Sequence, residues 1–236
     1  MNIYSTQLCL RNRDVNLHRV LRTSTLFEMM QEASIRHTEE LGMGREMTLD
    51  RGLLWMVTHQ RADITRLPVY DERITLESWP GKTMHLLFPR FYRVLDAQGH
   101  VLLRASSLWA LVDAGTRRMV FPDRHGIVIE GVETGEEAAL PAAPRRASGG
   151  QAHSFTVPFS YVDLNGHMNN TRYFDLAEDL IPAAAEGRQL CRATVEYACE
   201  ARLGEKISVT AEEAGSCFYI GGDGEKKIFR MLMEYR

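Results

Sequence analysis

The hydrophobic pattern of the first half changes once from helical to alternating spacing. Residues 25–41 carry apolar side chains at helical spacing from Leu26 onward, and Gly42 stands where a helix would end. Thr25 and Glu28 fit a capping box, in which two side chains satisfy free backbone amides at a helix start. The pattern therefore predicts an amphipathic helix over 25–41.

Alternating segments surround this helix and predict strands. Turn-forming residues separate two of these segments at 96–99 and close another at 113–116, which is typical of hairpins. We expect His37 and Glu40 to be solvated or to lie at the helix edge. One long helix with an antiparallel sheet is an α+β unit. The predicted strands are 3–10, 53–57, 73–79, 86–95, 101–112 and 118–121.

The second half repeats this order of elements. Residues 131–151 are small, charged and rich in proline, which predicts a linker between a repeat at 1–130 and a repeat at 152–236. Asn170 is placed to cap a shorter helix that ends near Ile181, before a proline. The two halves share the order of their elements, but their sequence identity is weak. The predicted strands are 155–159, 190–200, 205–213, 216–221 and 226–235, with a hairpin turn at 221–224.

Composition narrows the class of protein. The chain has 236 residues, 25% of them charged, and a net charge of −3, so no basic field indicates a nucleic-acid partner. Four scattered cysteines lack the spacing of a zinc site or a disulfide framework, so we expect no metal and a reducing, cytoplasmic environment. No run has the length of a signal peptide core or a membrane span, and we expect neither.

One stretch, Tyr161–Phe174, combines a carboxylate, an imidazole and three carboxamides with apolar neighbours. Buried polar groups need partners, so such a mixture is typical of the mouth of a pocket. The alternative is a hydrogen-bonded Asx turn that leads into a helix. A similar D-x-N-x-H stands at Asp14, Asn16 and His18, but it lies two residues further from its helix and has arginine-rich neighbours, so we treat it as coincidence.

The stretch Asp163-Leu-Asn165-Gly-His167-Met-Asn-Asn-Thr-Arg-Tyr173, followed by Val195-Glu-Tyr-Ala-Cys-Glu200, resembles the plant and bacterial fatty acyl-ACP thioesterases. The first half agrees at Gln31-Glu-Ala33, Trp55-Met-Val57 and Ser78-Trp-Pro80. The resemblance covers nearly the whole chain. It implies a double hot-dog fold, in which two tandem repeats each have a long helix wrapped by an antiparallel sheet.

The resemblance also implies a function and a set of site residues. The expected reaction is hydrolysis of a fatty acyl thioester of acyl carrier protein, with catalytic chemistry in the second repeat and the acyl tail in the first. Matching the family pattern places the catalytic residues at Asp163, Asn165, His167 and Glu200, with no cofactor. The cysteine that many plant members carry after this glutamate is replaced here by Ala201.

The residues support this chemistry independently. A positioned base near neutral pH suits His167 or Glu200, Asn165 can orient the thioester or the water, and Asp163 can fix both neighbours by accepting their N–H groups. Asn169 and Asn170 are expected to cap the helix, whose start would bind an oxyanion. Along a strand, Glu200 and Glu196 would share a face that excludes Cys199, which favours water over a cysteine nucleophile.

Other features of the function stay open at this stage. Substrate could be carried by coenzyme A, or the fold could bind acyl chains without hydrolysis; a dehydratase is disfavoured because its usual active-site segment is not apparent. A homodimer is left open. Candidates for the tail pocket are Met29, Met30, Trp55, Met56, Trp79 and Phe88, and core packing is the alternative for each. Candidates for docking the acidic carrier are Arg172, Arg188, Arg192 and Arg202.

Overall fold

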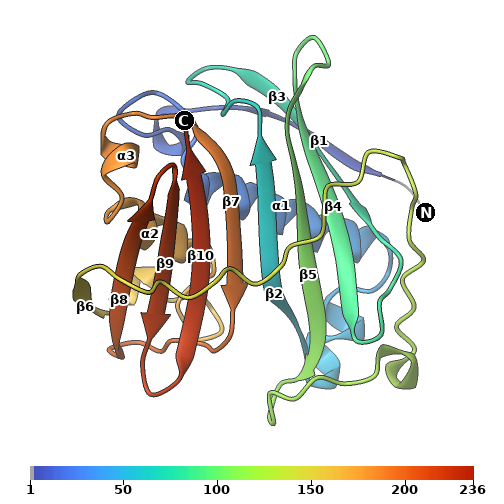
Figure 1. Ribbon diagram of the computed structural model, residues 1–236. Helices are drawn as coiled ribbons and strands as arrows, with labels where there is room; N and C mark the ends of the chain where they lie inside the picture. Colours follow the sequence, from blue (N-terminus) through green and yellow to red (C-terminus); the bar gives the residue numbers. More distant parts are fainter. Residues whose placement is uncertain (1–2) are drawn as a thin grey trace.

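The protein folds as one continuous ten-stranded antiparallel sheet with its helices on one face (Figure 1). The computed structural model describes residues 3–236; Met1 and Asn2 of the expected first repeat lie outside this range. The strand order β1-β3-β4-β5-β2-β7-β10-β9-β8-β6 places the five strands of each half together. The expected double hot-dog architecture is confirmed in this arrangement.

The first half builds one side of the sheet around α1 (Thr23–Glu40). Alternating residues of its strands face α1 and form the main core with it. Residues 118–121, expected as a strand, contribute only a single bridge between Met119 and Val112. The strands are β1 (Tyr4–Cys9), β2 (Leu53–Ile64), β3 (Arg73–Pro80), β4 (Leu87–Asp96) and β5 (Val101–Asp113).

The second half has shorter helices than the first. The helix expected from Asn170 to Ile181 is α2 (Arg172–Glu178), and Pro182 opens a separate single turn, α3 (Pro182–Ala185). Proline cannot donate the backbone bond that would continue α2, which explains the break. The strands are β6 (Ala152–Thr156), β7 (Leu190–Tyr197), β8 (Lys206–Ala214), β9 (Cys217–Asp223) and β10 (Lys227–Tyr235).

Two details of α1 differ from the expectation. The helix begins at Thr23, two residues earlier than predicted, so Thr25 lies inside it and forms no capping box; Thr23 instead donates a 2.5 Å hydrogen bond to Glu178 of α2. His37 is 1% exposed and its Nδ1 lies 3.1 Å from Nη1 of Arg90, so it is buried and not solvated. The packing of His37 in α1 against Arg90 of β4 therefore overrides the polar character of the imidazole.

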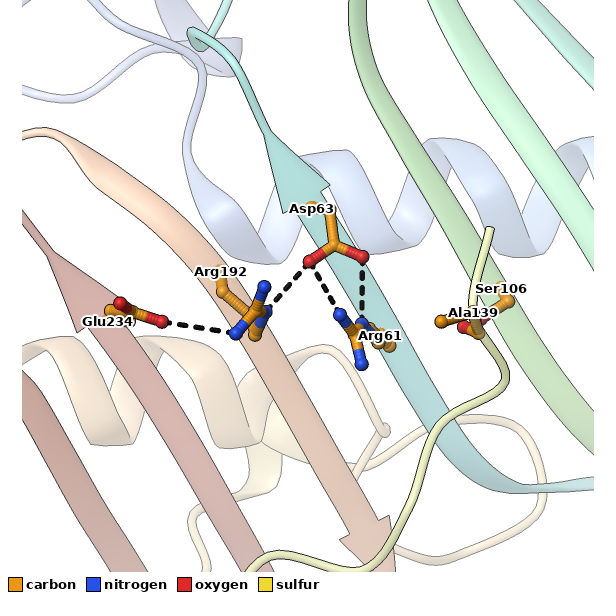
Figure 2. A network of polar contacts seen from close by, with 6 residues as sticks. All are labelled: Arg61, Asp63, Ser106, Ala139, Arg192 and Glu234. Carbon is orange, nitrogen blue, oxygen red and sulfur yellow. Dashed lines mark hydrogen bonds and ion pairs between the residues drawn. The ribbon is translucent and has the colours of Figure 1, made fainter. Parts of the chain in front are cut away.

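The two repeats join along β2 and β7, which pair antiparallel from His59–Glu196 to Asp63–Arg192. On the outer face of this junction, Asp63 binds Arg61 of its own strand and Arg192 of β7, and Arg192 also reaches Glu234 of β10 (Figure 2). On the helix side, Phe27 of α1 stacks on Phe174 of α2 with ring centroids 4.1 Å apart. Contacts on both faces therefore hold the repeats together.

The segment between His125 and Ala152 has no helix or strand and crosses the sheet on the face opposite α1 (Figure 1). Several contacts attach it to the sheet. The hydroxyl of Ser106 donates a hydrogen bond to the carbonyl of Ala139 at 2.7 Å (Figure 2), and Arg145 forms an ion pair with Glu212 at 2.8 Å. The segment predicted as a linker is thus packed along the sheet.

Candidate active site

The polar stretch of the second repeat forms a tight loop ahead of α2. The backbone N–H of Asp163 donates to the carbonyl of His167 at 2.9 Å, and the Asp163 carboxylate accepts the backbone N–H of Asn165 at 2.8 Å. Gly166 has a φ of +81°, a left-handed conformation that glycine adopts without strain. Beyond the loop, the N–H of Met168 donates to the carbonyl of Ala201 at 2.8 Å. These bonds hold the loop against the chain that follows β7.

His167 and Glu200 meet at this point. Nε2 of His167 lies 3.1 Å from Oε2 of Glu200, and both side chains are largely shielded, at 12% and 27% exposed. The other ring nitrogen, Nδ1, is buried and has no hydrogen-bond partner among residues 3–236. Because Nδ1 has no partner, Nε2 is the ring nitrogen through which His167 contacts Glu200.

Arg117 also reaches Glu200, and no pattern in the sequence pointed to this residue. Its Nη1 lies 3.4 Å from Oε1 of Glu200. Arg117 follows β5 of the first repeat in a turn with a φ of +57°, while Glu200 belongs to the second repeat. A turn of the first repeat therefore completes the environment of a carboxylate in the second.

These residues line a small cavity of about 100 Å³ at the junction of the repeats. A water molecule occupies about 30 Å³ in the liquid, so the cavity has room for a few waters or a small group of a substrate. Residues 54–57 of β2 form the wall opposite the loop. From the loop and the end of β7, the lining residues are Asp163, Asn165, His167, Asn170, Tyr197, Cys199 and Glu200.

The four predicted site residues line one cavity, but two of the arguments about the strand that leads to Glu200 were wrong. Strand β7 ends at Tyr197, so period-two alternation does not extend to Glu200. Glu196, expected to share its face, points to the other side of the sheet and binds Lys227 at 2.8 Å. Because the chain is irregular after Tyr197, Cys199 lines the same cavity as Glu200. The imidazole of His167 nevertheless contacts the carboxylate of Glu200.

The cap at the helix start differs in part from the expectation. Asn169, and not Asn170, caps the turn: its side-chain oxygen accepts the backbone N–H of Thr171 at 2.9 Å. The N–H groups of Arg172 and Phe174 donate to the carbonyls of Asn169 and Thr171. These two amides are already bonded, and the exposed carboxamide of Asn165 lines the cavity as a neutral donor.

Asp163 holds its neighbours differently from the expectation. Its carboxylate accepts the backbone N–H of Asn165, but it does not bind the imidazole of His167, whose Nδ1 is unpaired within residues 3–236. Asp163 therefore shapes the loop.

Within residues 3–236, no three His, Cys, Asp or Glu side chains are arranged to hold a metal ion, and none of the described helices could span a membrane.

Comparison with known proteins agrees with this architecture. Two tandem sheet-and-helix repeats in one continuous sheet define a double hot-dog protein. Models of the acyl-ACP thioesterase N-terminal domain and C-terminal domain match residues 1–122 and 145–231. The chain belongs to the acyl-ACP thioesterase family.

The curated relatives are plant enzymes. "Acyl-[acyl-carrier-protein] hydrolase FATB3, chloroplastic" of Cuphea viscosissima is 26% identical over 95% of this chain and 57% of its own length. "Dodecanoyl-[acyl-carrier-protein] hydrolase, chloroplastic" of Umbellularia californica is 24% identical over 91% of this chain and 60% of its own length. The chain thus spans less than two thirds of these relatives.

Solved structures share the fold over the full chain. An acyl-ACP thioesterase from Bacteroides thetaiotaomicron has a TM-score of 0.89 at 21% identity, covering 99% of this chain and 98% of that one. The 12:0-ACP thioesterase from Umbellularia californica has a TM-score of 0.81 at 22% identity, covering 99% and 97%.

Proposed function

We propose that the protein hydrolyses the thioester between a fatty acyl chain and acyl carrier protein, which releases the free fatty acid and ends chain elongation. One observation carries this proposal: the 3.1 Å contact between His167 and Glu200 inside a cavity lined by both repeats. Family membership supports the choice of a thioester. A carboxylate held beside an imidazole is an arrangement that activates water.

In the proposed reaction, Glu200 takes a proton from a water molecule in the cavity. The water oxygen forms a bond to the thioester carbonyl carbon. The carbon–sulfur bond then breaks, and the departing thiolate takes the proton back from Glu200, so the carboxylate is restored. Nε2 of His167 and Nη1 of Arg117 lie beside different oxygens of Glu200, so both keep the carboxylate directed at the water.

The developing negative charge on the carbonyl oxygen needs a donor. We assign this role to the carboxamide of Asn165, which lines the cavity. A single oxyanion donor is worth about 10²–10³-fold in rate. Asp163 fixes the loop that carries Asn165 through the 2.8 Å bond to its backbone N–H.

We further propose that residues 1–130 bind the acyl tail and residues 152–236 carry the chemistry. Trp55 and Met56 line the cavity on the β2 side, so they are placed to contact the acyl chain next to the thioester. Met30 and Trp79 are fully buried in the core, which leaves them as packing residues. Each buried CH₂ contributes about 0.8 kcal/mol, so chain length is set by where the pocket is walled.

Acyl carrier protein is the proposed carrier, with coenzyme A as the alternative. The four arginines suggested for docking do not form one surface: Arg192 is bound to Asp63 and Glu234 on the outer face of the sheet, whereas Arg172 binds Asp175 on the helix side. Arg202 is exposed and follows Glu200 by two residues, so it is the best placed of the four.

The test is a comparison of initial rates on acyl-ACP and acyl-CoA that carry the same acyl chain. We expect a higher kcat/KM on acyl-ACP, with free fatty acid as the product. Faster hydrolysis of acyl-CoA would show that coenzyme A, and not acyl carrier protein, is the preferred carrier. Tight acyl-ACP binding without release of fatty acid would identify a non-hydrolytic binding protein instead.

A further inference from the structure

The loop ahead of α1 has the same backbone bonding as the loop that carries His167. The N–H of Asn16 donates to the carbonyl of Val20 at 2.9 Å, and the Asn16 side-chain oxygen accepts the N–H of His18 at 2.9 Å. Arg19 has a φ of +63° where the second loop has Gly166. By these bonds, Asn16, His18 and Val20 correspond to Asp163, Asn165 and His167.

The partner strand corresponds as well. The N–H of Leu21 donates to the carbonyl of Pro68 at 2.8 Å, as Met168 does to Ala201, and Val20 bridges Val69 as His167 bridges Arg202. Leu67 therefore stands where the second repeat has Glu200. The D-x-N-x-H letters at 14–18 are a coincidence, because Asn16 and not Asp14 matches Asp163.

A cleft of about 690 Å³ lies at this position, and we call it the second site. As in the catalytic cavity, one wall comes from a loop of one repeat and the other from the opposite repeat. Its walls are mainly apolar, and the water-activating groups are replaced by Val20 and Leu67. Its apolar lining residues include Leu17, Val20, Leu67, Ile181 and Leu190.

Two polar groups of the second site lack partners. Tyr235 is among the residues that line the cleft, and its buried hydroxyl has no hydrogen-bond partner within residues 3–236. Arg188 also lines the cleft and has no ion pair in the same range. Arg66 is neutralised by Glu72 through two hydrogen bonds, and the carboxyl groups of Glu178 and Asp179 also lie along the lining.

We propose that the second site binds a free fatty acid without chemistry, with the chain along Val20, Leu67 and Leu190 and the carboxylate at Tyr235 and Arg188. The orphaned hydroxyl and the unpaired guanidinium supply the donors that a carboxylate accepts. The apolar walls match an acyl chain. The identity of the ligand rests on the proposed function, because a fatty acid is the product of that reaction.

The test uses equilibrium dialysis of dodecanoate, below its micelle concentration, against the full-length protein. Leu17 is 78% exposed at the rim of the second site, so Leu17→Asp adds a negative charge with little effect on folding. We expect Leu17→Asp to bind one equivalent of dodecanoate fewer than the wild type and to hydrolyse acyl-ACP at the wild-type rate. Leu164 holds the corresponding place in the other loop and is 91% exposed, so Leu164→Asp is the matched control and should retain this equivalent.

A second variant probes the hydroxyl itself. Tyr235→Phe removes a hydroxyl that has no hydrogen-bond partner among residues 3–236, and we expect it to weaken dodecanoate binding by about three- to tenfold. Equal stoichiometry in the wild type and Leu17→Asp, or no saturable binding by the wild type, would overturn the proposal. The dialysis readout is independent of turnover, so absence of acyl-ACP hydrolysis would refute the proposed function without deciding this one.

Discussion

Two side chains from distant parts of the chain meet at the carboxylate of Glu200. His167 and Glu200 come from the second repeat, and Arg117 comes from a turn of the first. The imidazole and the guanidinium bind different oxygens of the carboxylate, so neither can replace the other in fixing its direction. The geometry of Glu200 therefore depends on both repeats.

Arg117→Ala removes one of these two contacts. We expect kcat for acyl-ACP hydrolysis to fall by about tenfold with KM changed much less, because a misdirected base weakens only the reacting state. Arg118 is the matched control, since it is the adjacent arginine and does not line the cavity. A rise in KM at unchanged kcat would show that Arg117 binds the substrate and does not position Glu200.

Glu178 gives a prediction for stability against pH. Burial raises its pKa to about 7, although the hydrogen bond from Thr23 opposes the shift. The folded protein therefore holds a proton that the unfolded chain releases near 4.5, so the contribution is present below that pH and is lost as pH rises through about 7.

We expect the free energy of unfolding to decrease between pH 5 and 8, as measured by urea unfolding, and Glu178→Gln to flatten this decrease. Glutamine keeps an acceptor for the Thr23 hydroxyl. An unchanged pH profile in Glu178→Gln would assign the dependence to other groups.

At the residue scale, the family pattern pointed to Glu200, while the alternation argument that excluded Cys199 from its face was wrong. The alternation argument assumed a strand through Glu200, but the strand ends at Tyr197. Arg117 was missed because its role depends on the pairing of β2 with β7, which no local pattern encodes. His37 was misjudged because burial beside Arg90 is also a tertiary effect.

At the scale of elements, most strands were predictable because apolar and polar residues alternate along them. Helix boundaries were harder to predict. α1 begins at Thr23, whose hydroxyl bonds to Glu178 of α2 across the two repeats, a contact that the local pattern does not show. Two helices of unequal length, α1 and α2, meet at the stacked rings of Phe27 and Phe174.

This ring stack should couple the repeats energetically. We expect Phe27→Leu and Phe174→Leu each to destabilise the protein, with a coupling of about 0.5–1.5 kcal/mol in a double-mutant cycle measured by urea unfolding. Phe155, which packs on Tyr161 elsewhere, provides the control pair: Phe27→Leu and Phe155→Leu should be additive. Additivity of the first pair would show that the stack adds nothing beyond burial.

The outer-face network at the same junction is expected to matter less. Hydrogen bonds from Arg61 and Arg192 lower the pKa of Asp63 despite the opposing effect of burial. These side chains are roughly a quarter to two fifths exposed, and such pairs are worth at most about 1 kcal/mol. Asp63→Asn should therefore cost less stability than either ring substitution, in the same unfolding assay at pH 7.

At the scale of the whole molecule, one sheet carries two related loop-and-strand sites at the junction of its repeats. One has His167 and Glu200, and its counterpart has Val20 and Leu67. The order of elements along the sequence predicted the duplication, but not that the loops correspond bond for bond. That correspondence lies in backbone geometry, which different side chains can share.

The most direct test of the account compares Glu200→Gln with Glu196→Gln. Both remove one carboxylate near the end of β7, but Glu196 binds Lys227 on the outer face, away from the cavity. In single-turnover hydrolysis of acyl-ACP, we expect Glu200→Gln to be slower than the wild type by about 10²–10⁴-fold and Glu196→Gln to match the wild type. Wild-type rates in Glu200→Gln, or equal losses in both variants, would contradict the central role of Glu200.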